Sequence, residues 1–184
     1  MTFLLRDATA SDLPAITQIY RDSVLTGTAS YELDPPDEAE MRARFEAIRS
    51  KHYPYIAAVG MDGTLLGYAY ASAFRTRPAY RWLVEDSIYL APEARGRGIG
   101  KALLNELVTR CTTAGFRQMV AVIGGASEAS CALHAALGFR MVGTMTGTGF
   151  KHQRWLDTVF MQRELGEGNT TPPGELAADK AMTG

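Results

Sequence analysis

The hydrophobic positions recur with two different periods along the chain, and this predicts a mixed α/β domain. In some segments apolar residues return every three or four positions, as they do in amphipathic helices. Short apolar runs between these segments predict strands, and Met119–Ile123 is apolar throughout, as in a strand buried on both faces. The predicted helices are residues 13–26, 37–50, 98–113 and a fourth that begins near Ser127 or Ser130 and ends at Gly138. The predicted strands are residues 3–8, 55–59, 65–74, 82–90, 119–123, 139–145 and 155–165.

The order of these elements, β-α-α-β-β-β-α-β-α-β-β, predicts one mixed sheet flanked by helices. A length of 184 residues suits a single domain. Asp62-Gly63 predicts a hairpin turn, and the polar, glycine-containing residues 146–153 are expected to form a loop. After residue 165 the apolar content falls, so we expect a domain over residues 1–165 and a flexible tail over residues 166–184.

The composition is that of an ordinary globular protein, with 46% apolar and 21% charged residues. A net charge of −1 does not favour a nucleic-acid partner. No apolar run approaches the roughly 18 residues of a membrane span, and no secretory signal is evident, so no membrane association is expected. Cys111 and Cys131 lack metal-ligand spacing. Reduced thiols, a cytoplasmic location and no metal are therefore expected.

The segment Ser87–Lys101 contains a strand end, a loop of arginines and glycines, and the start of a helix. The first amides of a helix have no partner inside the helix and carry partial positive charge, so this arrangement suits an anion. Two common phosphate-binding patterns do not fit. The spacing of the glycines differs from GxGxxG, and Ala102 follows Lys101 where the GK[ST] pattern needs a hydroxyl. The pattern R-x-x-G-x-G does fit, through Arg95, Gly98 and Gly100.

This loop, the order of elements and the later sequence Leu137-Gly138-Phe139 resemble the GNAT acetyltransferase superfamily over residues 3–165. Within it, five segments in the same order are similar to the phosphinothricin and methionine sulfoximine N-acetyltransferases. These segments are Thr28–Tyr31, Val84–Tyr89, Val120–Gly124, Leu133–Phe139 and Gly149–Asp157. The resemblance implies a single-domain acyl-CoA N-acyltransferase fold, acetyl-CoA as cofactor, a small amino-acid-like amine as acceptor, and a homodimer.

The resemblance also assigns residues to the cofactor. It implies that the pantetheine arm pairs with the backbone of the strand at Ile88, Tyr89 and Leu90. The pyrophosphate is expected on the loop and the helix start, at Arg95, Gly96, Arg97, Gly98, Ile99, Gly100 and Lys101. A further contact, usually made by an asparagine, is expected from Ser127, with Ser130 as a second candidate. Serine can donate and accept there, but with a shorter reach.

An α-amine is protonated at neutral pH and needs a general base before it can attack a thioester. The resemblance places the catalytic glutamate at Glu85. Alternation along the strand puts Glu85 and Ser87 on one face and Asp86 on the other. Neighbouring buried aromatic residues would raise the pKa of this carboxylate, as suits a base; the alternative is a glutamate at the solvent end of a strand. His134 is expected either to assist the departing thiolate or to pack its helix.

The acceptor's carboxylate needs a cation, and the resemblance implies Arg75, next to Thr76 and Arg77 in the linker between two strands. Tyr31 is expected to line the acceptor pocket, or simply to pack. The expected substrate-binding residues are thus Tyr31, Arg75, Thr76, Arg77, Glu85, Asp86 and Ser87. From the homodimers of the family we further expect Phe150–His152 to reach a neighbouring subunit's site.

Three functions remain open at this point. The leading one is acetylation of an amino-acid analogue such as phosphinothricin, methionine sulfoximine or methionine sulfone. The second is acetylation of another small amine or of a protein N-terminus. The third is a non-catalytic coenzyme A sensor, against which Glu85 beside an intact loop argues.

Overall fold

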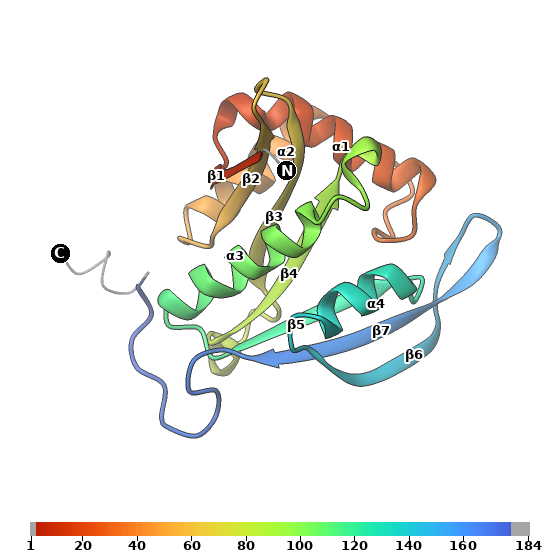
Figure 1. Ribbon diagram of the computed structural model, residues 1–184. Helices are drawn as coiled ribbons and strands as arrows, with labels where there is room; N and C mark the ends of the chain where they lie inside the picture. The colour runs from red at the N-terminus through yellow and green to blue at the C-terminus, as the bar shows by residue number, and fades with distance from the viewer. Residues whose placement is uncertain (1–2, 178–184) are drawn as a thin grey trace.

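The computed structural model describes residues 3–177, and within them seven strands form one mixed sheet covered by four helices (Figure 1). The strands are β1 (Phe3–Asp7), β2 (Tyr55–Gly60), β3 (Leu65–Ala73), β4 (Leu83–Leu90), β5 (Gln118–Gly124), β6 (Arg140–Lys151) and β7 (Arg154–Glu164). The helices are α1 (Leu13–Thr26), α2 (Glu38–Arg49), α3 (Ile99–Thr113) and α4 (Glu128–Ala135). Short 3-10 turns occur at Ala10–Asp12, Pro78–Tyr80 and Pro92–Ala94. The predicted fold class is confirmed.

The sheet has the strand order β1-β2-β3-β4-β5-β7-β6, and only the β4–β5 pair is parallel. That pair is short: it joins Leu83 to Gln118, Val84 to Met119 and Glu85 to Val120, and then ends. Beyond Glu85 the two strands diverge, so the sheet opens into a V between β1–β4 and β5–β7 (Figure 1). Helix α3 packs on the first half, and α4 packs on the second.

The core forms where apolar side chains of the helices meet the sheet. The inner face of α3 contributes side chains that are fully buried, namely Leu103, Leu104, Leu107 and Cys111. On the other face α1 buries Leu13, Ile16 and Val24. A tyrosine cluster lies beside α1, in which the rings of Tyr68 and Tyr89 stack at 5.3 Å and Tyr20 meets Tyr89 edge-on at 5.0 Å. No helix within residues 3–177 has both the length and the apolar composition needed to cross a bilayer.

The expectation of a loop over residues 146–153 is wrong, because β6 continues to Lys151. Glycine and threonine are common in loops, and this composition hid the pairing of the segment with β7. The pairing register of β6 with β7 shifts between Met145 and Gly149. The strand is irregular at this point, and its pairing with β7 resumes on the far side. The turn of the hairpin lies at His152 and Gln153, both in the left-handed backbone region with φ of 50° and 60°.

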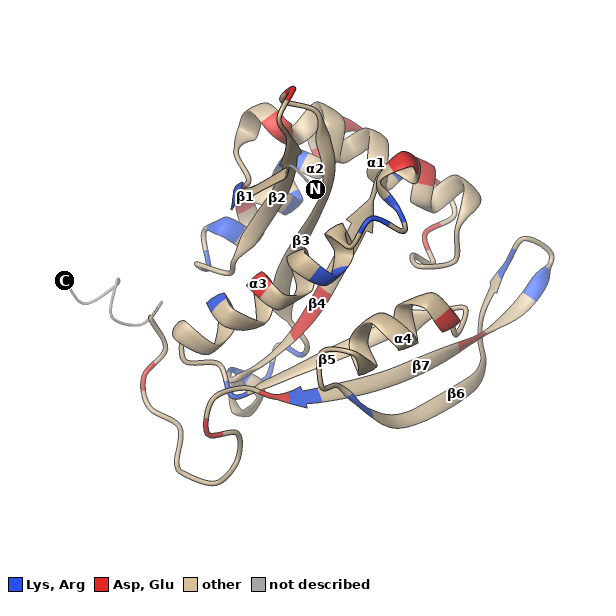
Figure 2. Ribbon diagram, viewed as in Figure 1, with Lys and Arg blue, Asp and Glu red and all other residues tan. Residues whose placement is uncertain are grey.

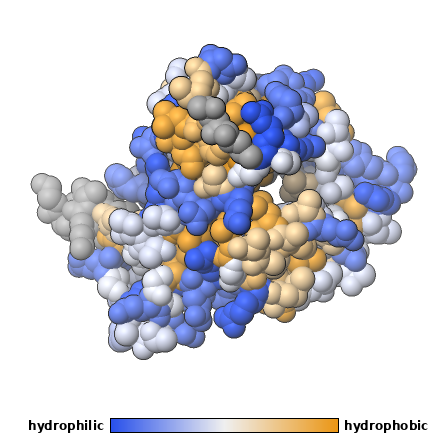
Figure 3. All heavy atoms as spheres, in the orientation of Figure 1, coloured by the Kyte–Doolittle hydropathy of each residue, from blue (hydrophilic) through white to orange (hydrophobic). Residues whose placement is uncertain are grey.

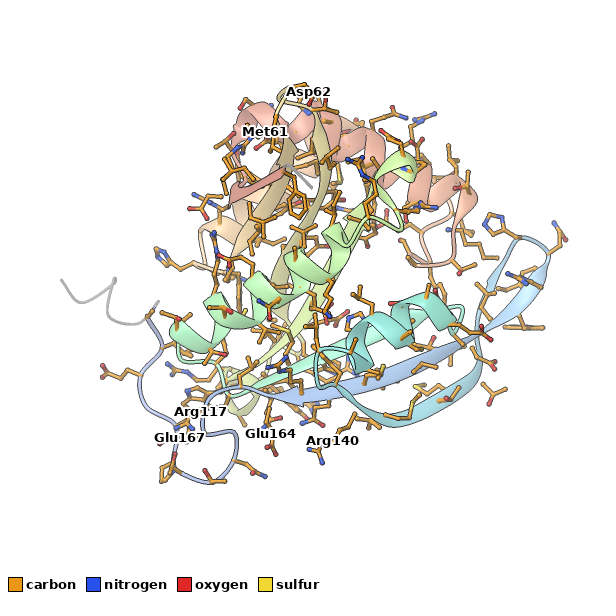
Figure 4. The ribbon with its side chains drawn as sticks, viewed as in Figure 1. Met61, Asp62, Arg117, Arg140, Glu164 and Glu167 are labelled. Carbon is orange, nitrogen blue, oxygen red and sulfur yellow. The ribbon has the colours of Figure 1, made fainter. Side chains whose placement is uncertain are left out.

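The segment after β7 runs back along the domain as far as residue 177. There Arg117 pairs with Glu167 at 3.3 Å (Figure 4), and the indole N–H of Trp82 donates to the carbonyl of Gly174 at 3.0 Å. The part of the expected flexible tail that the structure describes thus lies against the domain. Residues 178–184 lie outside the described residues, and the domain boundary at residue 165 stays a prediction.

We predict that Leu107→Ala destabilises the protein by about 2–5 kcal/mol, because this side chain of α3 is fully buried and its loss leaves a cavity. Urea denaturation followed by circular dichroism measures the effect. Leu25→Ala on α1 is the matched control, since Leu25 is 48% exposed and its truncation should change stability by less than about 0.5 kcal/mol. Equal losses in both variants would contradict this assignment of the core.

Candidate active site

A pocket of about 360 Å³ lies where β4 and β5 separate. Its walls come from the loop after α1 and from strands β4 to β7. The lining residues are Ala29, Tyr31, Glu85, Val122, Gly124, Met145, Thr148, Thr158 and Phe160. Two expected site residues that are far apart in the sequence, Tyr31 and Glu85, are therefore brought together in one cavity.

Glu85 is the last residue of β4 that pairs with β5, and its side chain is half-buried in this pocket. Burial is the main cause that raises the pKa of Glu85 to about 7, and the negative charge of Asp86 adds to it. The positive charge of Arg75 acts in the opposite direction. Near neutral pH this carboxylate is thus balanced between its two protonation states, as suits a general base.

Tyr31 is held rigidly between two glycines. A Cβ at Gly124 would lie 2.9 Å from the ring's Cε1, and one at Gly149 would lie 2.6 Å from Cε2, so a side chain at either position would collide with the ring. The hydroxyl of Tyr31 lies 2.8 Å from Thr158 Oγ1 and accepts a hydrogen bond from the N–H of Gly125 at 3.2 Å. The ring therefore forms a fixed wall of the pocket.

The loop that carries Tyr31 is also tied to the β6–β7 hairpin. The ammonium of Lys151, which is buried, donates to the carbonyl of Ser30 at 2.8 Å, and His152 Nε2 donates to the carbonyl of Gly27 at 3.1 Å. Lys151 and His152, which were expected to reach a neighbouring subunit, thus bind their own chain. Phe150 remains 52% exposed.

The loop between β4 and α3 fits a diphosphate. Gly98 is the N-cap of α3 with φ of 77°, and Gly96 has φ of 70° with open space where a Cβ would stand. The helix dipole favours an anion at this N-terminus, where the first amides of α3 have no partner inside the helix. The loop is strongly basic in Figure 2 and contributes the exposed side chains of Arg95, Arg97 and Lys101. Ile99 and Gly100 are buried at the helix start.

The backbone of β4 beyond Glu85 fits the extended arm of the same cofactor. Ile88, Tyr89 and Leu90 are half-buried, and the edge of β4 that faces β5 is released from strand pairing there. At the start of α4, Ser127 is the N-cap and accepts from the N–H of Ser130 at 3.4 Å. Both serines were expected to contact the cofactor, and both are only partly buried beside the V.

The remaining expected residues are distributed differently. Ser87 shares the face of β4 with Glu85, whereas Asp86 points to the opposite face and pairs with the buried His134 at 3.0 Å. Asp86 is therefore not in the acceptor pocket. Arg75, Thr76 and Arg77 are exposed in the linker after β3, and the guanidinium of Arg75 lies 4.6 Å from the ring centroid of Phe74.

The sequence reasoning missed several lining residues. Thr148 was hidden by the wrong loop assignment, and Met145, Thr158 and Phe160 were treated only as parts of strands. The alternation of β7 places Thr158 and Phe160 on one face, and that signal could have identified them. No group of three or more metal-ligating side chains occurs in the described part of the chain.

Residues 13–139 match the acetyltransferase (GNAT) family. The chain is 52% identical to the phosphinothricin N-acetyltransferase of Alcaligenes faecalis over 88% of this chain and 82% of the relative. It is 39% identical to the L-methionine sulfoximine/L-methionine sulfone acetyltransferase of Pseudomonas paraeruginosa, over 94% of this chain and all of the relative. The crystal structure of a GNAT superfamily phosphinothricin acetyltransferase from Sinorhizobium meliloti in complex with AcCoA superposes with a TM-score of 0.95. It is 65% identical and covers 97% of both chains.

We predict that the free energy of unfolding of Glu85→Gln rises relative to that of the wild type as the pH rises. The pKa of Glu85 is raised from 4.5 to about 7 in the folded state, so between these values the folded protein binds a proton that the unfolded chain releases. The free energy of unfolding of the wild type must therefore fall as the pH rises through this window. That of the variant has no such decrease, because glutamine does not titrate. Urea unfolding of both proteins between pH 4.5 and pH 8 measures it, and parallel curves would contradict the burial of this carboxylate.

Proposed function

Because the chain belongs to the acetyltransferase (GNAT) family, we propose that its acceptor is the α-amine of a small amino-acid analogue. The chain is an acetyl-CoA-dependent N-acetyltransferase. The proposal adds that the acceptor is of the phosphinothricin, methionine sulfoximine or methionine sulfone type, as the names of the relatives suggest. A role in resistance to such herbicide-like or antibiotic compounds, and a cytoplasmic location, belong to the same proposal.

The observation that carries the proposal is the position of Glu85. This carboxylate faces the acceptor pocket at the point where β4 leaves β5, and its pKa of about 7 leaves much of it ionised at neutral pH. A protonated amine that enters the pocket therefore meets a base beside the strand edge that fits the cofactor.

Each part of the chain has a distinct task in the reaction. Bound acetyl-CoA supplies the acetyl group as an activated thioester. The first amides of α3 and the cations around them would hold its diphosphate, and the free edge of Ile88–Leu90 would align its arm. Glu85 removes the proton from the amine, so that the nitrogen lone pair becomes available.

The acceptor side of the pocket selects a small anionic amine. Tyr31, Met145 and Phe160 provide apolar walls, and the hydroxyl groups of Thr148 and Thr158, 2.6 Å apart, provide polar contacts. Arg75 acts electrostatically on Glu85 from the exposed linker, which supports its assignment to the acceptor's carboxylate. Thr76 and Arg77 continue this linker and stay predicted contacts.

A homodimer is also part of the proposal. The β6–β7 hairpin projects from the body in Figure 1 and exposes several large apolar side chains on the edge of the sheet. These are Met141, Val142, Met145, Phe150 and Trp155, all more than half exposed. Exposed apolar side chains along one hairpin favour burial against a second copy. Because Met145 also lines the pocket, that contact would lie close to the acceptor.

We predict that Glu85→Gln lowers kcat with phosphinothricin or methionine sulfoximine by about 10²–10⁴-fold, the usual contribution of a general base. Acetyl-CoA affinity, measured by calorimetry, should stay unchanged. Turnover is followed by release of the coenzyme A thiol. Glu46→Gln on the exposed face of α2 is the matched control and should retain the wild-type rate.

The same assay on a panel of acceptors tests the substrate class. Turnover of sulfoximines and phosphinothricin, without turnover of N-terminal peptides or of amines that lack a carboxylate, is the expected result. Turnover of peptides alone would replace the proposed acceptor by a protein N-terminus. Cofactor binding without any turnover would indicate a coenzyme A sensor.

We predict that Trp155→Glu shifts the protein from dimer to monomer, because Trp155 is 69% exposed on the hairpin and a charge there opposes burial. Sedimentation velocity at micromolar concentration measures the change. Leu4→Glu is the control, since Leu4 is 60% exposed on β1, the opposite edge of the sheet. A monomeric wild type, or equal dissociation of both variants, would contradict this interface.

A further inference from the structure

The buried pair formed by Asp86 and His134 is not used by the mechanism above. Its side chains are only 3% and 5% exposed, and His134 Nε2 lies 3.0 Å from Asp86 Oδ2. The other ring nitrogen, Nδ1, lies 2.7 Å from the backbone carbonyl of Ser130. The ring also meets Phe139 edge-on at 5.0 Å, so it is fixed on all sides.

The hydrogen bonds determine where the protons are. A backbone carbonyl only accepts, so Nδ1 must carry a proton to bind Ser130. A second proton on Nε2 lets the ring donate to Asp86 Oδ2 at 3.0 Å as well. The two hydrogen bonds therefore favour a doubly protonated His134.

The surroundings support this charge state. Burial lowers the pKa of His134, but the hydrogen bond and charge of Asp86 and the carbonyl of Ser130 outweigh it, so the net shift is upward. Of the titratable groups on neighbouring elements, Cys111 of α3 is kept neutral, because burial and the charge of Asp86 raise the pKa of its thiol. Glu85 acts only from the opposite face of β4.

The position of the pair explains what it can do. Asp86 follows the last residue of β4 that pairs with β5, whereas His134 belongs to α4, which packs on β5 and β7. The pair thus spans the two halves of the sheet directly beside the point where backbone pairing stops. Figure 3 shows hydrophobic residues gathered on the surface over α4, and the pair itself is buried.

We propose that Asp86 and His134 form a buried ion pair that sets the opening between β4 and β5, and that both are positioning residues for the cofactor. This inference rests on the proposed function only in naming the cofactor as the molecule that enters the opening. Both N–H groups of His134 are occupied, so the ring does not donate to the departing thiolate. Of the two sequence expectations for His134, the proposal therefore favours a histidine that packs its helix over one that assists the departing thiolate.

The protonation state is tested first, on the ligand-free protein. Long-range ¹H–¹⁵N correlation spectra of histidine-labelled protein separate imidazolium from neutral imidazole, and the spectrum of His134→Gln assigns the signal. We expect an imidazolium at pH 7 in the wild type, and loss of this signature at pH 7 in Asp86→Asn. A neutral ring in the wild type at pH 7 would overturn the proposal.

The positioning role is tested by steady-state kinetics. Asp86→Asn retains an acceptor for Nε2 but removes the charge, and we expect KM for acetyl-CoA to rise about tenfold with kcat within about threefold. Asp86→Ala should raise KM further. The control is Asp12→Asn, which disrupts another partly buried pair, with Arg6 at 2.7 Å, far from the opening, and should leave KM unchanged.

Two kinetic results would overturn the proposal. One is a fall in kcat of more than 100-fold at unchanged KM in folded His134→Gln, which would identify a proton donor. The other is an equal rise of KM in Asp12→Asn, which would indicate general destabilisation. An inactive wild type would refute the proposed function instead, and the spectroscopic result would still decide the ion pair.

Discussion

The early end of the β4–β5 pairing is the constraint on which the rest of this structure depends. Parallel strands normally continue their hydrogen bonds along the shared length, but here only three residues of β4 pair with β5. The backbone groups of β4 beyond Glu85 are therefore unpaired with β5 in the middle of the sheet, and not at its outer edge. Because buried backbone groups need partners, this unpaired edge favours an extended ligand that lies along β4.

The same point in β4 separates two carboxylates that are adjacent in sequence. Strand alternation turns Glu85 into the acceptor pocket and Asp86 to the face of α3 and α4. The charge of Asp86 helps to raise the pKa of Glu85, while His134 balances that charge on its own face. One dipeptide thus places a carboxylate of raised pKa in the pocket and the proposed link across the two halves of the sheet.

The sequence predicted the geometry of the glycine loop better than the make-up of the pocket around Glu85. The glycine loop and the start of α3 are local features, and the backbone geometry of Gly96 and Gly98 agrees with the pattern that indicated them. Glu85 was identified through resemblance and strand alternation. The partner of Asp86 was not, since a contact across 48 residues leaves no local signal. The glycine-rich part of β6 was mistaken for a loop because its pairing depends on β7.

This difference has a physical origin that also bears on specificity. The donor side consists of backbone amides, a helix terminus and exposed cations, all of which tolerate changes elsewhere in the chain. The acceptor side depends on side chains from distant segments, with Tyr31 clamped between Gly124 and Gly149 and its loop fastened by Lys151. A substitution at either glycine would displace the ring and reshape the pocket, whereas the cofactor loop would be untouched. The shape of the pocket therefore depends on the contacts around Tyr31, which lie apart from the loop between β4 and α3.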